Sequence, residues 1–254
     1  MALVALAVSL FGAVGMVRAV NADMNSVQRE ETASSALSPP DAEFENYLFV
    51  GSDSRVGADP SDPDYGNVGD AGDIGGQRSD TLMVLHYVKR TGTVSLMSIP
   101  RDLWVAIGNG KKEQRINTAY QEGTDVLVRT VQRALNIPIH HYVEIDFQGF
   151  KRIVDAVGGV NVCVEHPSRD KHTGLFMRPG CSTLDGVKAL AYARSRSFEQ
   201  KVDDDWRLDG TADIGRSTRQ RGFVQALVKS SVLALTSNPF KAGDVLRGGL
   251  SAVV

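Results

Sequence analysis

Arginine side chains gather late in the sequence, next to apolar residues. Six of them lie between Leu190 and Phe223, although the formal net charge of the 254-residue chain is only -2. A guanidinium group that is half-buried without a partner is costly, so the cluster indicates an anionic ligand. Planar guanidinium groups match phosphate oxygens particularly well. The candidates are Arg194, Arg196, Arg207, Arg216, Arg219 and Arg221.

The last predicted helix, residues 215–235, directs part of this cluster inward. Positions spaced i, i+4, i+7 and i+11 form one stripe along a helix. That stripe consists of Arg216, Gln220, Phe223 and Leu227. Its first two members are therefore predicted to point into a pocket beside the core, with Arg219 one ridge away. Arg207 and Arg221 are interpreted as surface charge, and residues 199–213 as an acidic loop.

A predicted β-hairpin brings a second charged group together. Residues 81–88 and 93–99 are rich in β-forming side chains, and KRTGT between them is typical of a turn that contains Gly92. The apolar run 47–50 is typical of a strand buried on both faces. If that strand also pairs antiparallel with 81–88, the ends of three strands meet at one edge of the sheet.

That edge carries both carboxylates and arginines. Asp53 follows the first strand, Arg78 and Asp80 precede the second, and Arg101 follows the third. Carboxylate oxygens suit a hard divalent cation such as Mg²⁺ or Mn²⁺, and the arginines suit phosphate oxygens. The pattern therefore indicates a site for a metal and an anion. Ordinary ion pairs that tie loops together would give the same spacing, and spacing alone does not separate the two interpretations.

Predicted strands and helices alternate along much of the remaining chain. The ranges are 141–145 and 160–165 for strands, and 125–135, 146–159 and 182–193 for helices. Asp146 is expected to cap the helix 146–159, and the helix 182–193 is expected to begin with capping residues. The alternation indicates an α/β fold, and the hairpin means that its sheet is not purely parallel.

The beginning of the chain is almost wholly apolar up to Val17. This length is at the lower limit for a membrane span. We interpret residues 1–20 as part of a transmembrane signal-anchor helix, and residues 21–43, which are polar and contain Ser, Ala and Pro, as an extracytoplasmic linker. A cleaved signal peptide is the alternative, and either interpretation exports the rest of the chain.

Cys163 and Cys181 are the two cysteines of the sequence. An oxidising compartment favours pairing them, so the sequence predicts a disulfide. A zinc site is a weaker interpretation, because neither cysteine belongs to a CxxC pair.

Seven motifs follow one another along the chain. They are NYLFVGSDSR, QRSDTLMVL, SLMSIPRDLWV, RINTAY, HYVEIDFQGFKRIVDAVGGV, LDGVKALAYARSR and RSTRQR. In order and character they resemble the LytR-CpsA-Psr (LCP) domain, from about Asn46 to the last helix. The resemblance implies a three-layer α/β/α fold around a central mixed sheet, with a long apolar pocket for a prenyl chain. It places the catalytic domain at 44–240 and the start of a C-terminal extension at 241–254.

The resemblance also implies roles for the charged residues. Asp53 and Asp80 look like the carboxylates that hold Mg²⁺ or Mn²⁺, and with Arg78 and Arg101 they make up the implied catalytic set. The implied pyrophosphate-binding residues are Arg78, Arg101, Arg194, Arg196, Arg216 and Gln220, with Arg219 beside them.

The family resemblance implies a single-pass enzyme of the cell membrane whose catalytic domain is extracytoplasmic. Such enzymes move a glycopolymer with one phosphate from a polyprenyl-pyrophosphate carrier to a peptidoglycan hydroxyl. The polymer, whether teichoic acid, capsule or arabinogalactan, is left open. A secreted phosphatase that uses water as acceptor and a non-catalytic binder of polyprenyl lipids are the alternatives. Nucleic acid is not an expected partner, because the chain is exported and its net charge is only -2.

Overall fold

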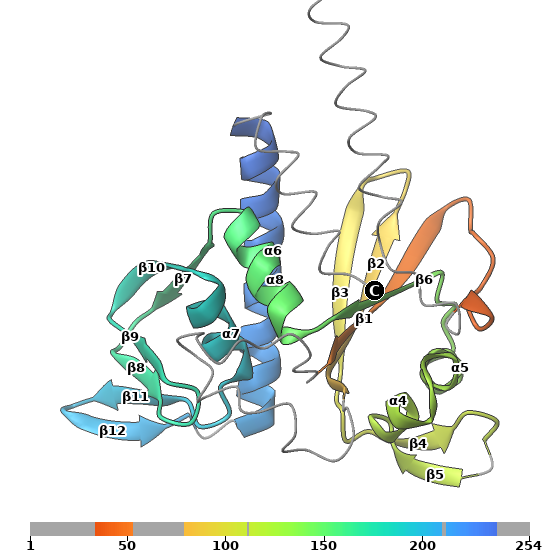
Figure 1. The fold of residues 1–254 in the computed structure, drawn as a ribbon, viewed down its shortest axis with the longest axis horizontal. Helices are drawn as coiled ribbons and strands as arrows, with labels where there is room; N and C mark the ends of the chain where they lie inside the picture. Colours follow the sequence, from red (N-terminus) through yellow and green to blue (C-terminus); the bar gives the residue numbers. More distant parts are fainter. Residues whose placement is uncertain (1–33, 53–78, 111, 210–211, 238–254) are drawn as a thin grey trace, which may run out of the picture.

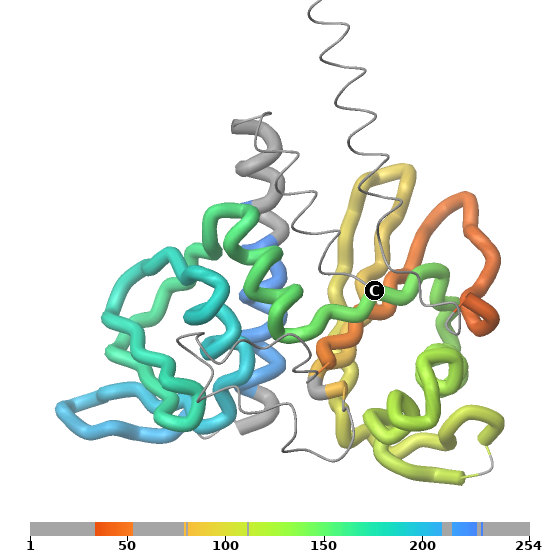
Figure 2. The backbone as a smooth tube through the Cα atoms, in the orientation of Figure 1, coloured from red at the N-terminus to blue at the C-terminus, as the bar shows by residue number. Residues whose placement is uncertain are grey.

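The protein, analysed as a computed structural model, is described over residues 34–52, 79–110, 112–209 and 212–237. These residues form two halves (Figure 1): a sheet with two helices and a small hairpin, and three helices with six short strands. The backbone tube in Figure 2 shows the chain passing from the first half to the second between β6 (His141–Ile145) and α6 (Phe147–Ala156).

The predicted anchor, residues 1–20, and most of the predicted linker, residues 21–43, lie outside the described residues. None of the helices in the described part of the chain combines the length and the apolar character that a membrane span requires.

A four-stranded mixed sheet forms the centre of the first half. Its strands are β1 (Phe44–Ser52), β2 (Ser79–Val88), β3 (Thr93–Ile99) and β6, in the order β3-β2-β1-β6. β2 pairs antiparallel with both β1 and β3, whereas β6 is parallel to β1. Gly92 lies in the turn of the hairpin with a φ of 67°, a conformation that favours glycine. The predicted hairpin and the mixed sheet are therefore confirmed.

Strand β1 is longer than predicted and is buried on one face only. Leu48 and Val50 are fully buried, while Tyr47 and Phe49 beside them are partly exposed. The buried face belongs to a hydrophobic cluster that includes helix α5 (Thr124–Leu135). The prediction of burial on both faces is wrong because alternate side chains of a strand point to opposite faces, and this cluster covers only one of them.

A second hairpin and a short helix complete the first half. β4 (Trp104–Ile107) pairs antiparallel with β5 (Lys112–Arg115), and α4 (Thr118–Glu122) follows. Ile107 and Ala119 are buried in the same hydrophobic cluster as α5. The sequence analysis did not predict this hairpin. Because β4 begins shortly after β3 in the chain, the hairpin lies next to the sheet edge where β3 ends.

Three helices organise the second half: α6, α7 (Gly186–Arg194) and α8 (Ala212–Ser237). The Asp146 carboxylate caps α6, as predicted, by accepting a 2.6 Å hydrogen bond from the backbone N–H of the third helical residue. Asp185 does the same for α7 at 2.8 Å. The helix predicted at 182–193 begins later, because its first residues belong to strand β10 (Gly180–Leu184).

Six short strands complete the second half as a two-stranded sheet, β10-β7, and a four-stranded sheet, β12-β11-β8-β9. They are β7 (Val160–Val164), β8 (Ser168–Asp170), β9 (Leu175–Met177), β10, β11 (Glu199–Val202) and β12 (Asp205–Leu208). The buried apolar residues of β7, β9 and β10 share a second hydrophobic cluster with Tyr192 and Phe223. The prediction of an acidic loop at 199–213 is wrong, because this segment contains the β11–β12 hairpin, which turns at Asp203 and Asp204.

The predicted disulfide is confirmed. Cys163 in β7 lies directly opposite Cys181 in β10, and the two sulfur atoms are bonded at 2.04 Å. The bond therefore joins neighbouring strands within the second half of the molecule.

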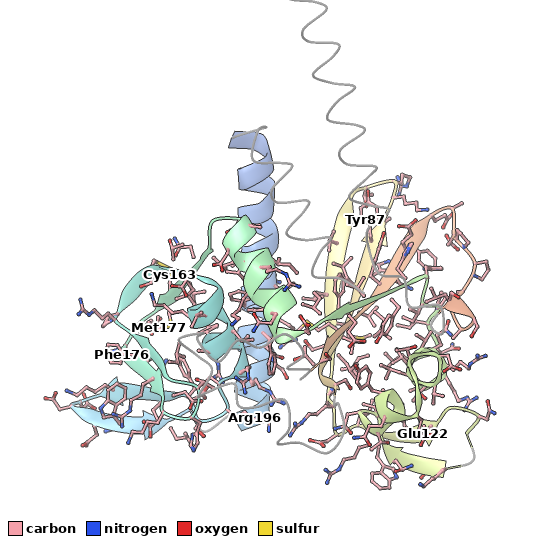
Figure 3. All side chains as sticks on the ribbon, in the orientation of Figure 1. Tyr87, Glu122, Cys163, Phe176, Met177 and Arg196 are labelled. Carbon is pink, nitrogen blue, oxygen red and sulfur yellow. A yellow bond between two sulfur atoms is a disulfide. The ribbon has the colours of Figure 1, made fainter. Side chains whose placement is uncertain are left out.

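Replacing Cys163 with Ser is expected to lower the free energy of unfolding by about 3 kcal/mol, because the bond closes a short loop in the unfolded chain. The loss of activity should be smaller, since Cys163 lies far from Arg196 at the junction of the two halves (Figure 3). Thermal unfolding with and without reductant measures the effect. A melting temperature that reduction leaves unchanged would contradict the prediction.

Candidate functional site

Arg101 lies at the sheet edge where the hairpin prediction placed it. It follows β3, and the pairing of Leu82 with Ile99 puts it beside the start of β2. Its Nε lies 3.5 Å from the Asp102 carboxylate, and that carboxylate lies 3.5 Å from Nη1 of Arg115. Asp102 therefore lies between two guanidinium groups.

A pocket of about 270 Å³ opens beside these three side chains. Its lining residues are Arg101, Asp102, Arg115, Asn117, Thr118 and Gln121. Arg115 is the last residue of β5, and the other new members lie on α4 or just before it. The sheet edge and the β4–β5–α4 segment thus form a cavity that carries both charges and neutral polar groups.

Arg194 and Arg196 come from the end of α7 and the segment after it. Figure 3 shows Arg196 near the junction of the two halves, on the side of the molecule that also carries the β4–β5 hairpin. The guanidinium carbon of Arg194 lies 4.6 Å from the centroid of the Phe147 ring, a distance typical of a cation–π contact. That contact orients the Arg194 side chain against the start of α6.

A buried carboxylate holds the segment on both sides of Arg196. Asp170 is 1% exposed, and its Oδ2 accepts hydrogen bonds from Ser195 Oγ at 2.7 Å and Ser197 N at 2.9 Å. Its Oδ1 accepts a further bond from His172 N at 2.8 Å. Burial alone would raise the pKa of Asp170, but the hydrogen bonds outweigh it and lower the pKa below its ordinary value. The carboxylate is therefore ionised at neutral pH.

Gln220 connects the sheet edge with the end of α7. Its Nε2 donates to Thr81 Oγ1 at 3.1 Å and to the Ala193 carbonyl oxygen at 3.0 Å. Thr81 lies at the start of β2, and Ala193 directly precedes Arg194. The inward direction predicted for this stripe of α8 is confirmed, since Arg216 is only 7% exposed. Groups from both halves of the molecule therefore meet at Gln220.

Arg219 of helix α8 contacts the segment 195–198, which follows α7. Its Nη1 lies 2.8 Å from Asp209 Oδ2, and its Nη2 donates to the Ser195 carbonyl oxygen at 2.9 Å. Its guanidinium carbon also lies 4.5 Å from the centroid of the Phe198 ring. These contacts support the backbone that carries Arg196, and direct phosphate binding by Arg219 stays a prediction.

The other two arginines of the cluster lie on the surface, as interpreted. The Arg207 side chain is 58% exposed and lies 3.6 Å from the Asp203 carboxylate. Arg221 is also exposed and donates to Thr218 Oγ1 at 3.3 Å. The candidate site therefore does not need either of them.

Part of the predicted site lies outside the described residues. This applies to Asp53 and Arg78, and for Asp80 the structure describes only the backbone. Asp80 falls at a bulge in the pairing of β1 with β2, and such bulges often re-aim a side chain next to an active site. Among the described residues, no group of three or more His, Cys, Asp or Glu could hold a metal. The Mg²⁺ site stays a prediction.

Three residues near the site were missed by the sequence analysis. Arg115 and Asn117 lie within the RINTAY motif, so the motif was noticed while its polar residues were not considered as ligands. Asp170 carries no local signal, because its partner Ser195 lies 25 positions further along the chain.

Almost the whole chain matches one protein family. The sequence profile of the LytR_cpsA_psr family covers residues 13–246. The chain belongs to the LytR-CpsA-Psr family. The resemblance inferred from the seven motifs is thereby confirmed.

Two curated relatives of this LCP protein carry names that state a function. "Probable cell wall biosynthesis protein LcpB" of Corynebacterium glutamicum is 40% identical over 198 residues, which are 77% of this chain and 44% of the relative. The polyisoprenyl-teichoic acid–peptidoglycan teichoic acid transferase TagU of Bacillus anthracis is 38% identical over 170 residues, which are 66% of this chain and 52% of the relative. The chain thus spans about half the length of these relatives.

A solved structure has the same fold. A LytR-Csp2A-Psr enzyme from Actinomyces oris superimposes with a TM-score of 0.65 and 27% sequence identity, over 82% of this chain and 68% of the other. The mixed α/β fold of this LCP protein, with its mixed sheet, therefore resembles that of an LCP enzyme.

Proposed function

We propose that this LCP protein transfers a phosphate-linked glycopolymer from a polyprenyl-pyrophosphate carrier to peptidoglycan. The observation that carries the proposal is the junction at Gln220, where the sheet edge with Arg101 meets the end of α7 with Arg194. Guanidinium groups from separate elements suit the several oxygens of a pyrophosphate. The name of the TagU relative supports the substrate class.

The proposed chemistry is phosphoryl transfer. A hydroxyl oxygen of peptidoglycan attacks the phosphorus atom that carries the glycan, a new P–O bond forms, and the bond to the bridging oxygen of the pyrophosphate breaks. Polyprenyl phosphate leaves with that oxygen, and the hydroxyl proton passes to a base. Positioning and charge stabilisation account for most of the catalysis of such a step, which suits Arg101, Arg196 and Arg216.

An apolar sheet face supports a lipid substrate. Apolar side chains from all four strands share the face of the main sheet opposite Leu48 and Val50. Met83 on this face is buried. The following residues of the same face are partly exposed: Tyr47, Phe49, Leu85, Leu96 and Val143. Thr81 lies on the same face of β2, and Gln220 binds it. A prenyl chain on this face would therefore end at the arginines that hold its pyrophosphate.

A metal ion and a membrane anchor complete the proposal. The carboxylates of Asp53 and Asp80 are the donors that a hard cation such as Mg²⁺ prefers, and the ion would neutralise charge on the pyrophosphate. Residues 1–20 would form a single membrane span that keeps the domain on the extracytoplasmic side, where peptidoglycan lies.

Removal of divalent metal is expected to stop transfer, because the pyrophosphate charge would then be only partly neutralised. Dialysis against EDTA followed by an assay with and without added Mg²⁺ measures this. Asp80→Asn should behave like the metal-depleted protein and should not recover with Mg²⁺. Undiminished transfer in EDTA would rule out the metal.

The test of the proposed function is a reaction with defined partners. The full chain is incubated with a polyprenyl-pyrophosphate-linked oligosaccharide and peptidoglycan, and the products are separated. A peptidoglycan conjugate together with polyprenyl phosphate is the expected result. Free sugar phosphate without conjugate would make the protein a phosphatase, and bound but unchanged lipid would make it a non-catalytic binder.

A further inference from the structure

The pocket beside Arg101 is lined by several polar side chains that pyrophosphate binding does not require. Two of its lining side chains are cationic, whereas the other four are one carboxylate, two amides and one hydroxyl: Asp102, Asn117, Thr118 and Gln121. Amides and hydroxyls both donate and accept hydrogen bonds, and a carboxylate only accepts them. A second phosphate group would be repelled by Asp102. The lining suits a neutral group that carries many hydroxyls.

Asp102 is held where it can accept hydrogen bonds from such a group. Its two oxygens lie 3.5 Å from Arg101 and from Arg115, longer than a close ion pair. The Asp102 side chain is 44% exposed, so it keeps hydrogen-bonding capacity on its open side. The carboxylate also offsets part of the positive charge of the pocket.

A tryptophan lies beside Arg115, one of the residues that line this pocket. Trp104 in β4 pairs directly with Arg115 in β5, so the two side chains lie on the same face of the hairpin. Leu103 and Val105, the neighbours of Trp104 in sequence, pack toward the hydrophobic core, and Trp104 points outward and is 64% exposed. A flat apolar ring therefore lies next to one of the lining residues of the polar pocket.

We propose that the pocket and Trp104 bind the sugar that is joined directly to the pyrophosphate. The inference rests on the proposed function and adds the part of the donor that confers specificity. Arg101 lines the pocket and also belongs to the proposed pyrophosphate site, so the group next to the phosphate enters the pocket. The polar residues then bind the ring hydroxyls, and the indole of Trp104 covers the apolar face of the sugar ring.

The test compares two lipids. One is polyprenyl pyrophosphate without sugar, and the other is the same lipid carrying a single N-acetylhexosamine. Replacement of Trp104 by Ala in the full chain is expected to weaken binding of the sugar-bearing lipid about tenfold, which corresponds to about 1.4 kcal/mol. Binding of the sugar-free lipid should stay unchanged. Trp104→Phe should restore most of the loss, because it keeps an aromatic ring.

Phe176 provides a matched control. It lies in β9, is 60% exposed, and stands at the outer edge of the second half, away from β4 and β5 (Figures 1 and 3). Phe176→Ala should therefore leave the affinity for both lipids unchanged. An equal drop for both lipids in Trp104→Ala, or no drop for either, would overturn the inference. A wild-type chain that binds neither lipid would instead overturn the proposed function, and the inference with it.

Discussion

Replacement of Arg101 by Ala is expected to lower the rate of transfer about 100- to 1000-fold, the usual effect of removing one preorganised donor from a charged transition state. Arg101 is the described arginine at the sheet edge, and it reaches the pocket from the end of β3. The fold should survive, because the Arg101 side chain is 23% exposed and belongs to neither hydrophobic cluster.

Single-turnover assays of Arg101→Ala and Arg101→Lys show whether the transfer rate depends on the charge of Arg101 or on the planar shape of its guanidinium group. Lysine keeps the charge but not the planar fork, so it should recover only part of the rate. Arg90→Ala is the matched control, because Arg90 is an exposed arginine at the turn of the same hairpin, at the other end of β2. A rate for Arg101→Ala within threefold of wild type, at unchanged stability, would remove Arg101 from the proposed site.

Asp170→Ala is expected to lower the free energy of unfolding by about 3 kcal/mol, because it leaves the buried hydroxyl of Ser195 and the partly buried N–H of Ser197 without their acceptor. The melting temperature should fall by about 6–12 °C for a domain of this size. Transfer should fall as well, even well below the melting temperature, since the backbone around Arg196 would lose its support. Asp205→Ala, which alters an exposed aspartate of β12, serves as the control.

The pH dependence of stability tests the same carboxylate. Because the folded pKa of Asp170 is lowered below 3.8, its ionised form adds stability that is fully present above that value and is lost as the pH falls through the lowered pKa. Unfolding by urea between about pH 7 and about pH 3 should therefore show wild type and Asp170→Asn converging on acidification. A constant difference would mean that the charge of Asp170 does not matter.

Features governed by neighbouring residues could be predicted from the sequence. The β2–β3 hairpin has a glycine in its turn, Asp146 immediately precedes an amphipathic segment, and Arg216 and Gln220 follow a helical stripe. Each depends on interactions within a few positions. The edge at Arg101 could be predicted for the same reason, since one hairpin register fixes it.

Features that depend on distant contacts or unusual turns could not be predicted. The β11–β12 hairpin turns at Asp203 and Asp204, whose φ values of 49° and 66° are usually adopted by Asn or Gly. For this reason the segment with the three consecutive aspartates, 203–205, was predicted to be a loop. The link between Asp170 and Ser195 arises only when β8 and the end of α7 are already packed together. The contribution of the β4–β5–α4 segment to the pocket likewise depends on where the preceding sheet ends.

The hydrogen bond from Gln220 to Thr81 joins helix α8 of the second half to strand β2 of the first, and the bond to Ala193 ties the same side chain to helix α7. Because the proposed anion-binding groups are divided between these halves, a ligand that binds only their docked arrangement would stabilise the boundary by mass action, by about 2.7 kcal/mol at one hundred times its dissociation constant. Amide hydrogen exchange along this boundary should therefore slow when the donor lipid is bound. The bound donor lipid would then help to hold the two halves together, and the protein would be most rigid while the lipid is bound.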